Sequence, residues 1–501
     1  MRGVSRVPVS VALLTLGLVA AASAIAALAL LLGLGERDPL DVSVKTIAER
    51  AGGSGAPGSG DPLAFEPGSS ERFAERATLG TSHVIYEKSP DGVSGSAERT
   101  AEWRDEVEVA ASAHGIDADL LEAIVFLESA GRAGVMADGT PGSATGLTQI
   151  IPSTATSLLG MQVDLARSLA LTRQIARALA KERTEKVIEL TRLRTEADER
   201  FDPAAALDGA ARYLEIAEER FGSQELAVVS YHMGIGNLEN VISEYTGQPT
   251  GAGRTRELVD AEGIDYARLF FDSSPQRHAD AWELLASFGD DSSLYYWRVR
   301  ASLGIMRLWR EDPDELSRIA DLATAKATLE ELYHPRDETE IYEEPGDVAD
   351  ARANGDLAPL PRDPSLGFKV AGQMGELAPE LDEDPELYRA LRPEALAALT
   401  YLAAKVKAIS GAGKPLKVTS TVRDRAYQEL LIGINAEATD EYSLHTTGWS
   451  FDILRRYDNE RQAEAFQFVL DRMRAHAMLD YAFEPAAIHV TVSNLARVLA
   501  E

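Results

Sequence analysis

The chain has 501 residues, of which 45% are hydrophobic and 26% charged, so it can bury the cores of two to four domains and is not a wholly disordered chain. Its 80 acidic residues outnumber its 50 lysines and arginines, and the net charge of −30 argues against a sequence-independent nucleic-acid binder. Cysteine is absent, which excludes disulfides and cysteine nucleophiles and leaves His, Asp and Glu as the ligands for any metal.

Residues 1–35 predict a signal anchor. Arg2 and Arg6 precede an uncharged apolar run, Val11–Leu34, which exceeds the roughly 20 residues that a helix needs to cross a bilayer. Positive charge before the run and acidic residues after it favour a cytoplasmic N-terminus. The alternative is a signal peptide cleaved near residues 22–24. Both interpretations place the bulk of the chain outside the cytoplasmic membrane.

The rest of the chain divides by composition into stretches of different character. We expect a flexible extracytoplasmic linker at 36–100, a helical domain at 101–250, a helical extension at 251–335, an acidic proline-rich linker at 336–367 and an α+β domain at 368–501. In the last of these, short β-like runs at 416–420 and 488–492 alternate with helices at 393–407 and 461–476. The predicted fold class is therefore multidomain: a transmembrane helix, an all-α domain with its extension, and a C-terminal α+β domain.

Glu128 is the first candidate catalytic residue. Asp117 can cap a helix over residues 119–128, in which Leu121 and Ile124 share a face with Glu128. A carboxylate on an apolar face, near the negative end of the helix dipole, should have a raised pKa. A raised carboxyl pKa suits a general acid for glycosidic cleavage. By itself the pattern also fits a surface or ion-paired glutamate.

Three further motifs follow Glu128-Ser129 in order. They are Gly146-Leu147-Thr148-Gln149, then Gly209-Ala210-Ala211-Arg212-Tyr213-Leu214, then Ala227 to Gly236 with Tyr231-His232 inside it. The four motifs, over about residues 101–245, resemble the ES, GLMQ, GAxYL and AxxxYNxG motifs of the soluble lytic transglycosylase family, which is related to goose-type lysozyme. The resemblance implies a lysozyme-like helical domain.

The resemblance also implies roles for individual residues. Glu128 would be the single catalytic acid and base, and the product would be a 1,6-anhydromuropeptide. Ser129 would support Glu128, while Gln149 and Tyr231 would line the glycan groove. His232 stands where the family has Asn, which puts that amide contact in doubt.

Two other features depart from the family pattern. Thr148 replaces the usual Met, and residues 163–199 look like an insertion. Between Leu165 and Thr195 the insertion holds eight Lys/Arg and three Glu. We expect a long amphipathic helix or a hairpin packed on its neighbours, and a basic contact for an anionic polymer is the alternative.

The C-terminal domain carries a His/Asp/His pattern. His445 and Asp452 lie in the run Ser443-Leu444-His445-Thr446-Thr447-Gly448-Trp449-Ser450-Phe451-Asp452, and His489 lies in a β-like run. Two imidazoles and a carboxylate with an open fourth position form a catalytic zinc site. The three residues taken alone also fit unrelated surface side chains.

The wider pattern, over about residues 410–495, resembles the D-alanyl-D-alanine carboxypeptidase/dipeptidase metallopeptidase family. Ser443-x-His445-x-x-Gly448-x-x-x-Asp452 matches its zinc signature, and Ser420-x-x-Arg423 followed by Gln428 matches its arginine motif. The resemblance implies zinc bound by His445, Asp452 and His489, with Arg423 orienting the substrate. The family's base, a Glu three residues before the last His, is missing. Glu484 is the nearest candidate and Asp480 a weaker one. A structural or peptide-binding relic is the alternative to an active peptidase.

Both resemblances imply the same substrate. The sequence therefore predicts a membrane-anchored enzyme that remodels peptidoglycan, cutting its glycan strands and its stem peptides, with no nucleic-acid partner. The alternatives are a non-catalytic wall-binding scaffold built from degenerate enzyme domains and a hydrolytic muramidase.

Overall fold

The computed structural model describes residues 40, 42–53, 55–433 and 442–501, which form two compact units. The helical unit combines Val84–Phe270 with Asp280–Ala320. The mixed unit combines the residues up to His83 with Phe271–Ala279 and Asp321–Glu501. Within the described ranges no helix is both long and apolar enough to cross a bilayer. The predicted anchor, residues 1–35, lies outside those ranges.

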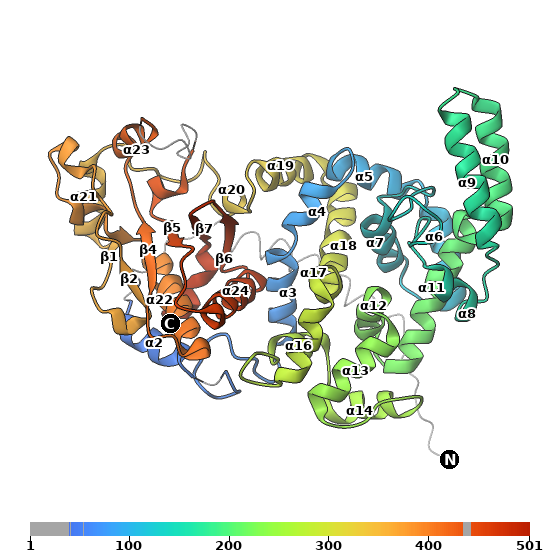
Figure 1. The fold of residues 1–501 in the computed structure, drawn as a ribbon, viewed down its shortest axis with the longest axis horizontal. Coiled ribbons are helices and arrows are strands. Elements are labelled where there is room, and N and C mark those ends of the chain that lie inside the picture. The colour runs from blue at the N-terminus through green and yellow to red at the C-terminus, as the bar shows by residue number, and fades with distance from the viewer. Residues whose placement is uncertain (1–39, 41, 54, 434–441) are drawn as a thin grey trace, which may run out of the picture. The chain divides into compact units, whose positions relative to one another are not determined.

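The helical unit is mostly α-helix, as a lysozyme-like domain requires (Figure 1). Its helices are α4 (His83–Lys88), α5 (Gly92–Ala101), α6 (Arg104–His114), α7 (Ala118–Ser129), α8 (Pro152–Ser157), α9 (Leu165–Leu179), α10 (Thr184–Ala197), α11 (Pro203–Phe221), α12 (Gln224–Met233), α13 (Ile235–Thr246), α14 (Arg254–Glu262), α15 (Tyr266–Phe271), α16 (Ala279–Ser287), α17 (Gly289–Ser293), α18 (Tyr295–Glu311) and α19 (Pro313–Thr324).

Helix α7 lies in the core of this unit and packs on α6 and α18. The Asp117 side chain accepts from the Asp119 amide, which confirms the predicted N-cap. Leu121, Ile124 and Val125 are completely buried. The helix therefore places Glu128, one turn further along, at the edge of an apolar core.

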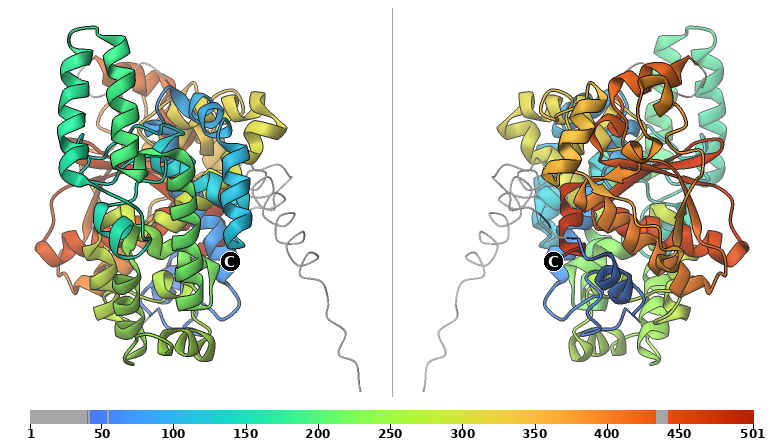
Figure 2. Two further views of the ribbon diagram at one scale, coloured as in Figure 1. Left: turned by 90° about the vertical axis from the view of Figure 1, so that its right-hand side faces the viewer. Right: turned by 90° about the vertical axis from the view of Figure 1, so that its left-hand side faces the viewer.

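Residues 163–199 form the helical hairpin α9–α10, which projects from its own unit (Figure 2). Its two helices bury a small cluster of their own, which includes Leu171, Ile175 and Leu190. A single bridge between Val163 and Asp198 closes the base. The insertion is therefore a hairpin rather than one long helix.

The mixed unit is built on a five-stranded sheet with the order β2-β4-β5-β7-β6, in which only β2 and β4 run parallel. The strands are β2 (Phe368–Val370), β4 (Leu416–Ser420), β5 (Ser450–Leu454), β6 (Leu479–Phe483) and β7 (Ala487–Val492), and the main helices are α22 (Pro393–Ser410) and α24 (Glu460–Ala475). The predicted strands at 416–420 and 488–492 and the predicted helices at 393–407 and 461–476 are confirmed to within a few residues.

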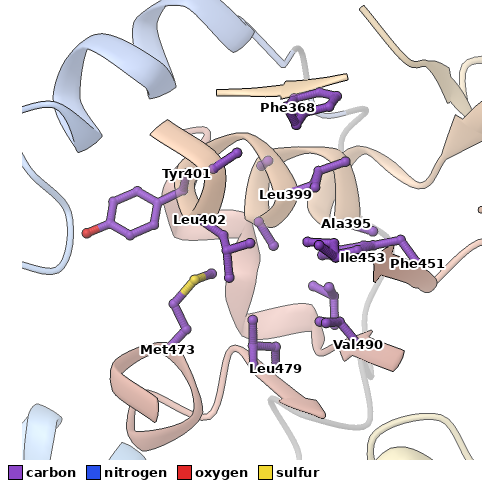
Figure 3. Close-up of a cluster of buried hydrophobic side chains, with 14 of the residues drawn as sticks. Phe368, Ala395, Leu399, Tyr401, Leu402, Phe451, Ile453, Met473, Leu479 and Val490 are labelled. Carbon is purple, nitrogen blue, oxygen red and sulfur yellow. The ribbon is translucent and has the colours of Figure 1, made fainter. Parts of the chain in front are cut away.

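Helix α22 covers the apolar face of the sheet. Figure 3 shows Ala395, Leu399 and Leu402 facing Phe451 and Val490, and all five belong to one buried cluster. Because successive side chains of a strand point to opposite faces, the residues between the apolar ones point away from this core. Asp452 and His489 occupy such positions.

The segment expected to be a flexible linker, residues 36–100, is instead largely helical. It forms α2 (Val44–Ala51), α3 (Ser70–Gly80), α4 and α5. Helix α2 buries Ile47 and Ala51 in the core of the mixed unit, against α22. Asp61 is buried with an ion pair of 2.8 Å to Lys405. The Gly/Ser/Pro composition predicted flexibility locally, but tertiary contacts of this kind override it.

The predicted boundaries at 251–335 and 336–367 also differ from the two units. Residues 271–279 and 321–335 of the expected extension are part of the mixed unit. The expected acidic linker contains α21 (Pro345–Asn354), whose Val348 packs with Tyr342 and Val422 in a small buried cluster. This acidic stretch therefore contains a short helix that packs on the mixed unit, and it is not a solvated linker throughout.

Candidate active sites

The carboxylate of Glu128 is half-buried at the end of α7 and accepts a hydrogen bond of 2.7 Å from the Tyr295 hydroxyl. Burial raises the pKa of Glu128 to about 7, although the Tyr295 hydrogen bond opposes that rise. The raised pKa predicted from the sequence agrees with this environment. Near neutral pH a large fraction of this carboxyl is protonated, as a general acid requires.

The rings of Tyr231 and Tyr213 pack in a row with the Tyr295 ring. The Tyr231 ring stacks on the Tyr295 ring with 6.2 Å between centroids, and the Tyr213 ring packs edge-on against Tyr231 at 5.2 Å. The Tyr231 hydroxyl donates to the Thr148 carbonyl at 2.8 Å. The structure therefore brings the predicted Tyr231 next to the acid and links it to the Gly146–Gln149 loop.

Arg200 holds the Gly146–Gln149 loop through contacts with residues on both sides of it. The Arg200 guanidinium is fully buried, pairs with Asp198, and donates to the carbonyls of Pro141 and Ile150 at 2.7 and 3.2 Å. Gly146 has a φ of +84°, and a Cβ there would lie 1.9 Å from the Arg200 carbonyl oxygen. Only glycine fits, which explains the first position of the motif.

Gln149 occupies an unusual backbone conformation for a side-chain-bearing residue, with a φ of +48°. Its amide Nε2 donates to the Gly146 carbonyl at 2.8 Å. Thr148, where the family has Met, is completely buried, and its hydroxyl donates to the Ala206 carbonyl at 3.2 Å. The replacement thus keeps the loop packed on α11.

Ser129 and His232 are near the acid but make other contacts. The buried Ser129 hydroxyl donates to the Val125 carbonyl of its own helix at 3.1 Å. His232 lies 3.0 Å from the Ser292 hydroxyl, and its ring is 5.2 Å from the Tyr295 ring. Ser129 therefore stabilises the end of α7, and His232 borders the tyrosine that holds Glu128.

The second site gathers His445, Asp452 and His489, as the sequence predicts. One ligand atom from each lies within 4.8 Å of the others. Asp452 on β5 faces His489 on β7 in the antiparallel register, and His445 comes from a 3-10 turn, Leu444–Thr447. The converging atoms are His445 Nε2 and His489 Nδ1, at 3.2 and 2.9 Å from Asp452 Oδ1.

The outer nitrogens of both rings have acceptors of their own. His445 Nδ1 lies 2.9 Å from the Thr421 carbonyl, and His489 Nε2 lies 3.5 Å from Glu330 Oε2. Protons on these outer nitrogens leave both inner nitrogens with lone pairs aimed at one carboxylate oxygen. Three electron-pair donors converge on one point, an arrangement that fits a bound cation.

Burial and neighbouring charges act in opposite directions on the pKa values of this cluster. Burial by itself opposes a charge on His489, but contacts with Asp452 and Glu330 raise its pKa to about 10. Burial would raise the pKa of Asp452, but the two histidines outweigh it and hold that pKa well below its usual range. The pocket thus favours positive charge beside Asp452.

Arg423 borders the metal-ligand cluster. It is 3.7 Å from Asp452 Oδ2 and donates to Gln428 Oε1 and Ser420 Oγ at 2.8 and 2.6 Å. The three residues of the Ser420-x-x-Arg423 and Gln428 pattern therefore contact one another. Burial lowers the pKa of Arg423, whereas the charges of Asp452 and Glu484 raise it.

The two candidate bases differ in surroundings. Glu484 lies at the β6–β7 turn, and its charge raises the pKa of Arg423. Asp480 is buried and accepts from the Leu329 amide at 2.9 Å. Asp480 is therefore engaged in packing, and Glu484 stays the candidate of the two.

Three residues that contact the sites were not predicted from the sequence. Tyr295 lies in the predicted helical extension, Glu330 lies far upstream of the candidate metal ligands, and Arg200 follows the insertion. None belongs to a short motif with Glu128 or His489. An aromatic cluster at residues 294–299 was the one available signal.

Comparison with known families gives a match within the helical unit. Residues 171–251 match the family model described as the transglycosylase SLT domain. The match starts inside α9 and includes Tyr213, Tyr231 and His232, while Glu128 and Gln149 precede it. It supports a lytic transglycosylase activity on peptidoglycan and does not extend into the mixed unit. A search of curated proteins finds no match to this chain.

Proposed function

We propose that the chain is a lytic transglycosylase that cleaves the bond between N-acetylmuramic acid and N-acetylglucosamine. The observation that carries this proposal is the half-buried Glu128, whose pKa is raised to about 7 and which is held by Tyr295. The SLT match in the following helices supports the substrate.

In the proposed reaction, Glu128 gives its proton to the glycosidic oxygen as the bond from the muramoyl C1 to that oxygen breaks. The resulting carboxylate then takes the proton of the muramoyl 6-hydroxyl as O6 bonds to C1. The ring closes, no water is consumed and Glu128 is protonated again. Tyr295 fixes the carboxyl throughout both proton transfers.

A hydrolytic muramidase is less well supported. Hydrolytic glycosidases ordinarily use two carboxyl groups about 5–9.5 Å apart. The motif around Glu128 offers no second carboxylate to pair with it. One carboxyl group suffices for the ring-closing route. Reducing-end products in a digest would instead establish the hydrolase.

We further propose that the mixed unit is a zinc-dependent peptidase acting on D-Ala-D-Ala ends or cross-links of stem peptides. His445, Asp452 and His489 would hold the ion, which when bound activates water and polarises a carbonyl. Arg423 would bind the substrate carbonyl or carboxylate, and Glu484 would accept the proton of the attacking water. Zinc content and release of D-alanine from a pentapeptide by the full chain test this proposal.

The scaffold alternative makes a different prediction for both units. A wall-binding protein would bind peptidoglycan without changing it, so neither anhydro ends nor free D-alanine would be found. We also propose that residues 1–35 anchor the chain in the cytoplasmic membrane with the remainder outside. Fractionation of cells, with protease added to intact spheroplasts, tests that orientation.

A further inference from the structure

Glu330 is a buried carboxylate close to the metal-ligand cluster, yet it comes from a different part of the chain. It begins α20 (Glu330–Tyr333), and 8% of the residue is exposed. Its Oε2 lies 3.5 Å from His489 Nε2, the nitrogen that faces away from Asp452. Glu330 therefore contacts the outer side of a candidate ligand rather than the position of an ion.

Neighbouring groups fix this carboxylate in place. The Thr328 hydroxyl donates to Glu330 Oε2 at 3.1 Å, and Thr491 Oγ1 lies 3.2 Å from His489 Nε2 and 3.5 Å from the same Oε2. The adjacent Leu329 amide donates to the buried Asp480 at 2.9 Å. The turn at 328–330 is thus attached to β7, the strand that carries His489, and to the neighbouring strand β6.

A buried carboxylate is costly unless its charge is used. A carboxylate that accepts from the outer nitrogen of a metal-bound histidine sets the tautomer, orients the ring and makes the inner nitrogen a better ligand. The His489 ring fits this arrangement, because Nδ1 lies toward Asp452 and Nε2 lies between Glu330 Oε2 and the Thr491 hydroxyl, which itself lies 3.5 Å from Glu330 Oε2.

We propose that Glu330 is the positioning residue of the metal site, which holds His489 in the tautomer that binds zinc. This inference rests on the proposed zinc site. It makes the segment at 321–335 a functional part of the mixed unit, although that segment shares no motif with the ligands.

The test is the zinc affinity of the full chain, measured by competition with a chromogenic chelator. Glu330→Gln keeps the size of the side chain and removes its charge. We expect this variant to bind zinc about 10- to 100-fold more weakly, the range found for such outer partners. Glu338→Gln changes an exposed carboxylate eight residues further along the chain; it is the matched control and should bind zinc like the unaltered chain.

Two further measurements separate positioning from a general loss of structure. The melting temperature of the metal-free Glu330→Gln protein should stay within a few degrees of the parent, and the visible spectrum of its cobalt form should shift. If the variant binds zinc as tightly as the parent, the inference is wrong and the zinc site stands. If the parent chain itself binds no zinc, the proposed site fails first.

Discussion

The Tyr295 hydroxyl and Glu128 Oε1 are joined by a hydrogen bond of 2.7 Å between the start of α18 and the end of α7. This contact connects the Glu128-Ser129 motif with a residue 167 positions away in the sequence. It lowers the pKa of Glu128 against the larger effect of burial. Tyr295 therefore adjusts both the position and the acidity of the proposed catalytic acid.

Replacing Tyr295 with Phe should move the pH dependence of transglycosylation. Loss of the hydrogen bond raises the pKa of Glu128, by about one unit for a bond worth 1–2 kcal/mol. The alkaline limb of the pH–rate profile should shift up by that amount, and turnover should fall about tenfold. Tyr296→Phe on the same helix is the control, and an unmoved limb in Tyr295→Phe would contradict the account.

Glu128 should also make stability depend on pH. Its pKa is about 7 in the folded chain against 4.5 for an ordinary Glu, so folding favours the protonated form. The unfolding free energy that this carboxyl contributes is fully present below pH 4.5 and is lost as pH rises through 7, up to about 3 kcal/mol. Melting curves from pH 4.5 to 8 should therefore show Glu128→Gln gaining stability over the parent. A constant difference would contradict the raised pKa.

Substitution of Gly146 should disturb the loop that carries Gln149. A methyl group at Gly146 would meet the Arg200 carbonyl at 1.9 Å and adopt a φ of +84°. We expect Gly146→Ala to lower stability by about 3 kcal/mol and to reduce transglycosylation. Gly142→Ala in the same loop, whose Cβ would meet only the Thr140 hydroxyl at 3.4 Å, should have little effect. Equal melting temperatures for the two variants would refute the steric argument.

The two activities should respond separately to metal removal. Asp452→Asn removes the carboxylate shared by both histidines, so we expect loss of zinc and of D-alanine release. Glycan cleavage should continue at the parental rate because the site around Glu128 requires no ion in the proposed reaction. Treatment with a chelator should give the same separation. Loss of both activities on chelation would show that this division is wrong.

Lys405 should be essential for the attachment of the N-terminal segment. Its ammonium pairs with Asp61 at 2.8 Å, and both side chains are at least 90% buried. Lys405→Met leaves the Asp61 charge without compensation, which typically costs 3–5 kcal/mol. Limited proteolysis should then cut within residues 52–68. Lys407→Met, at an exposed site on the same helix, should leave the cleavage pattern unchanged.

The local features of both sites could be predicted from the sequence. The cap at Asp117, the apolar face of α7 and the strand pattern at residues 416–420 and 488–492 depend on neighbours within a few residues. The cluster of His445, Asp452 and His489 could be predicted because these residues match a family pattern. These are the signals that periodicity and capping carry.

The long-range contacts could not be predicted in this way. Tyr295 and Glu330 reach their sites from segments whose composition indicated only helix or linker. Residues 36–100 form folded helices because α2 buries Ile47 and Ala51 against α22, far along the chain. Local composition carries no information on packing partners far along the chain, and here tertiary packing determines which residues are helical.

Mass spectrometry of peptidoglycan digested by the full chain, with and without Glu128→Gln, tests the central claim most directly. We predict 1,6-anhydromuropeptides from the parent chain and at least a 10³-fold loss in the variant, since general acid–base catalysis is worth about 10²–10⁴ and both proton transfers depend on Glu128. Anhydro products that persist in Glu128→Gln, or a parent digest that contains none, would contradict the proposed transglycosylase.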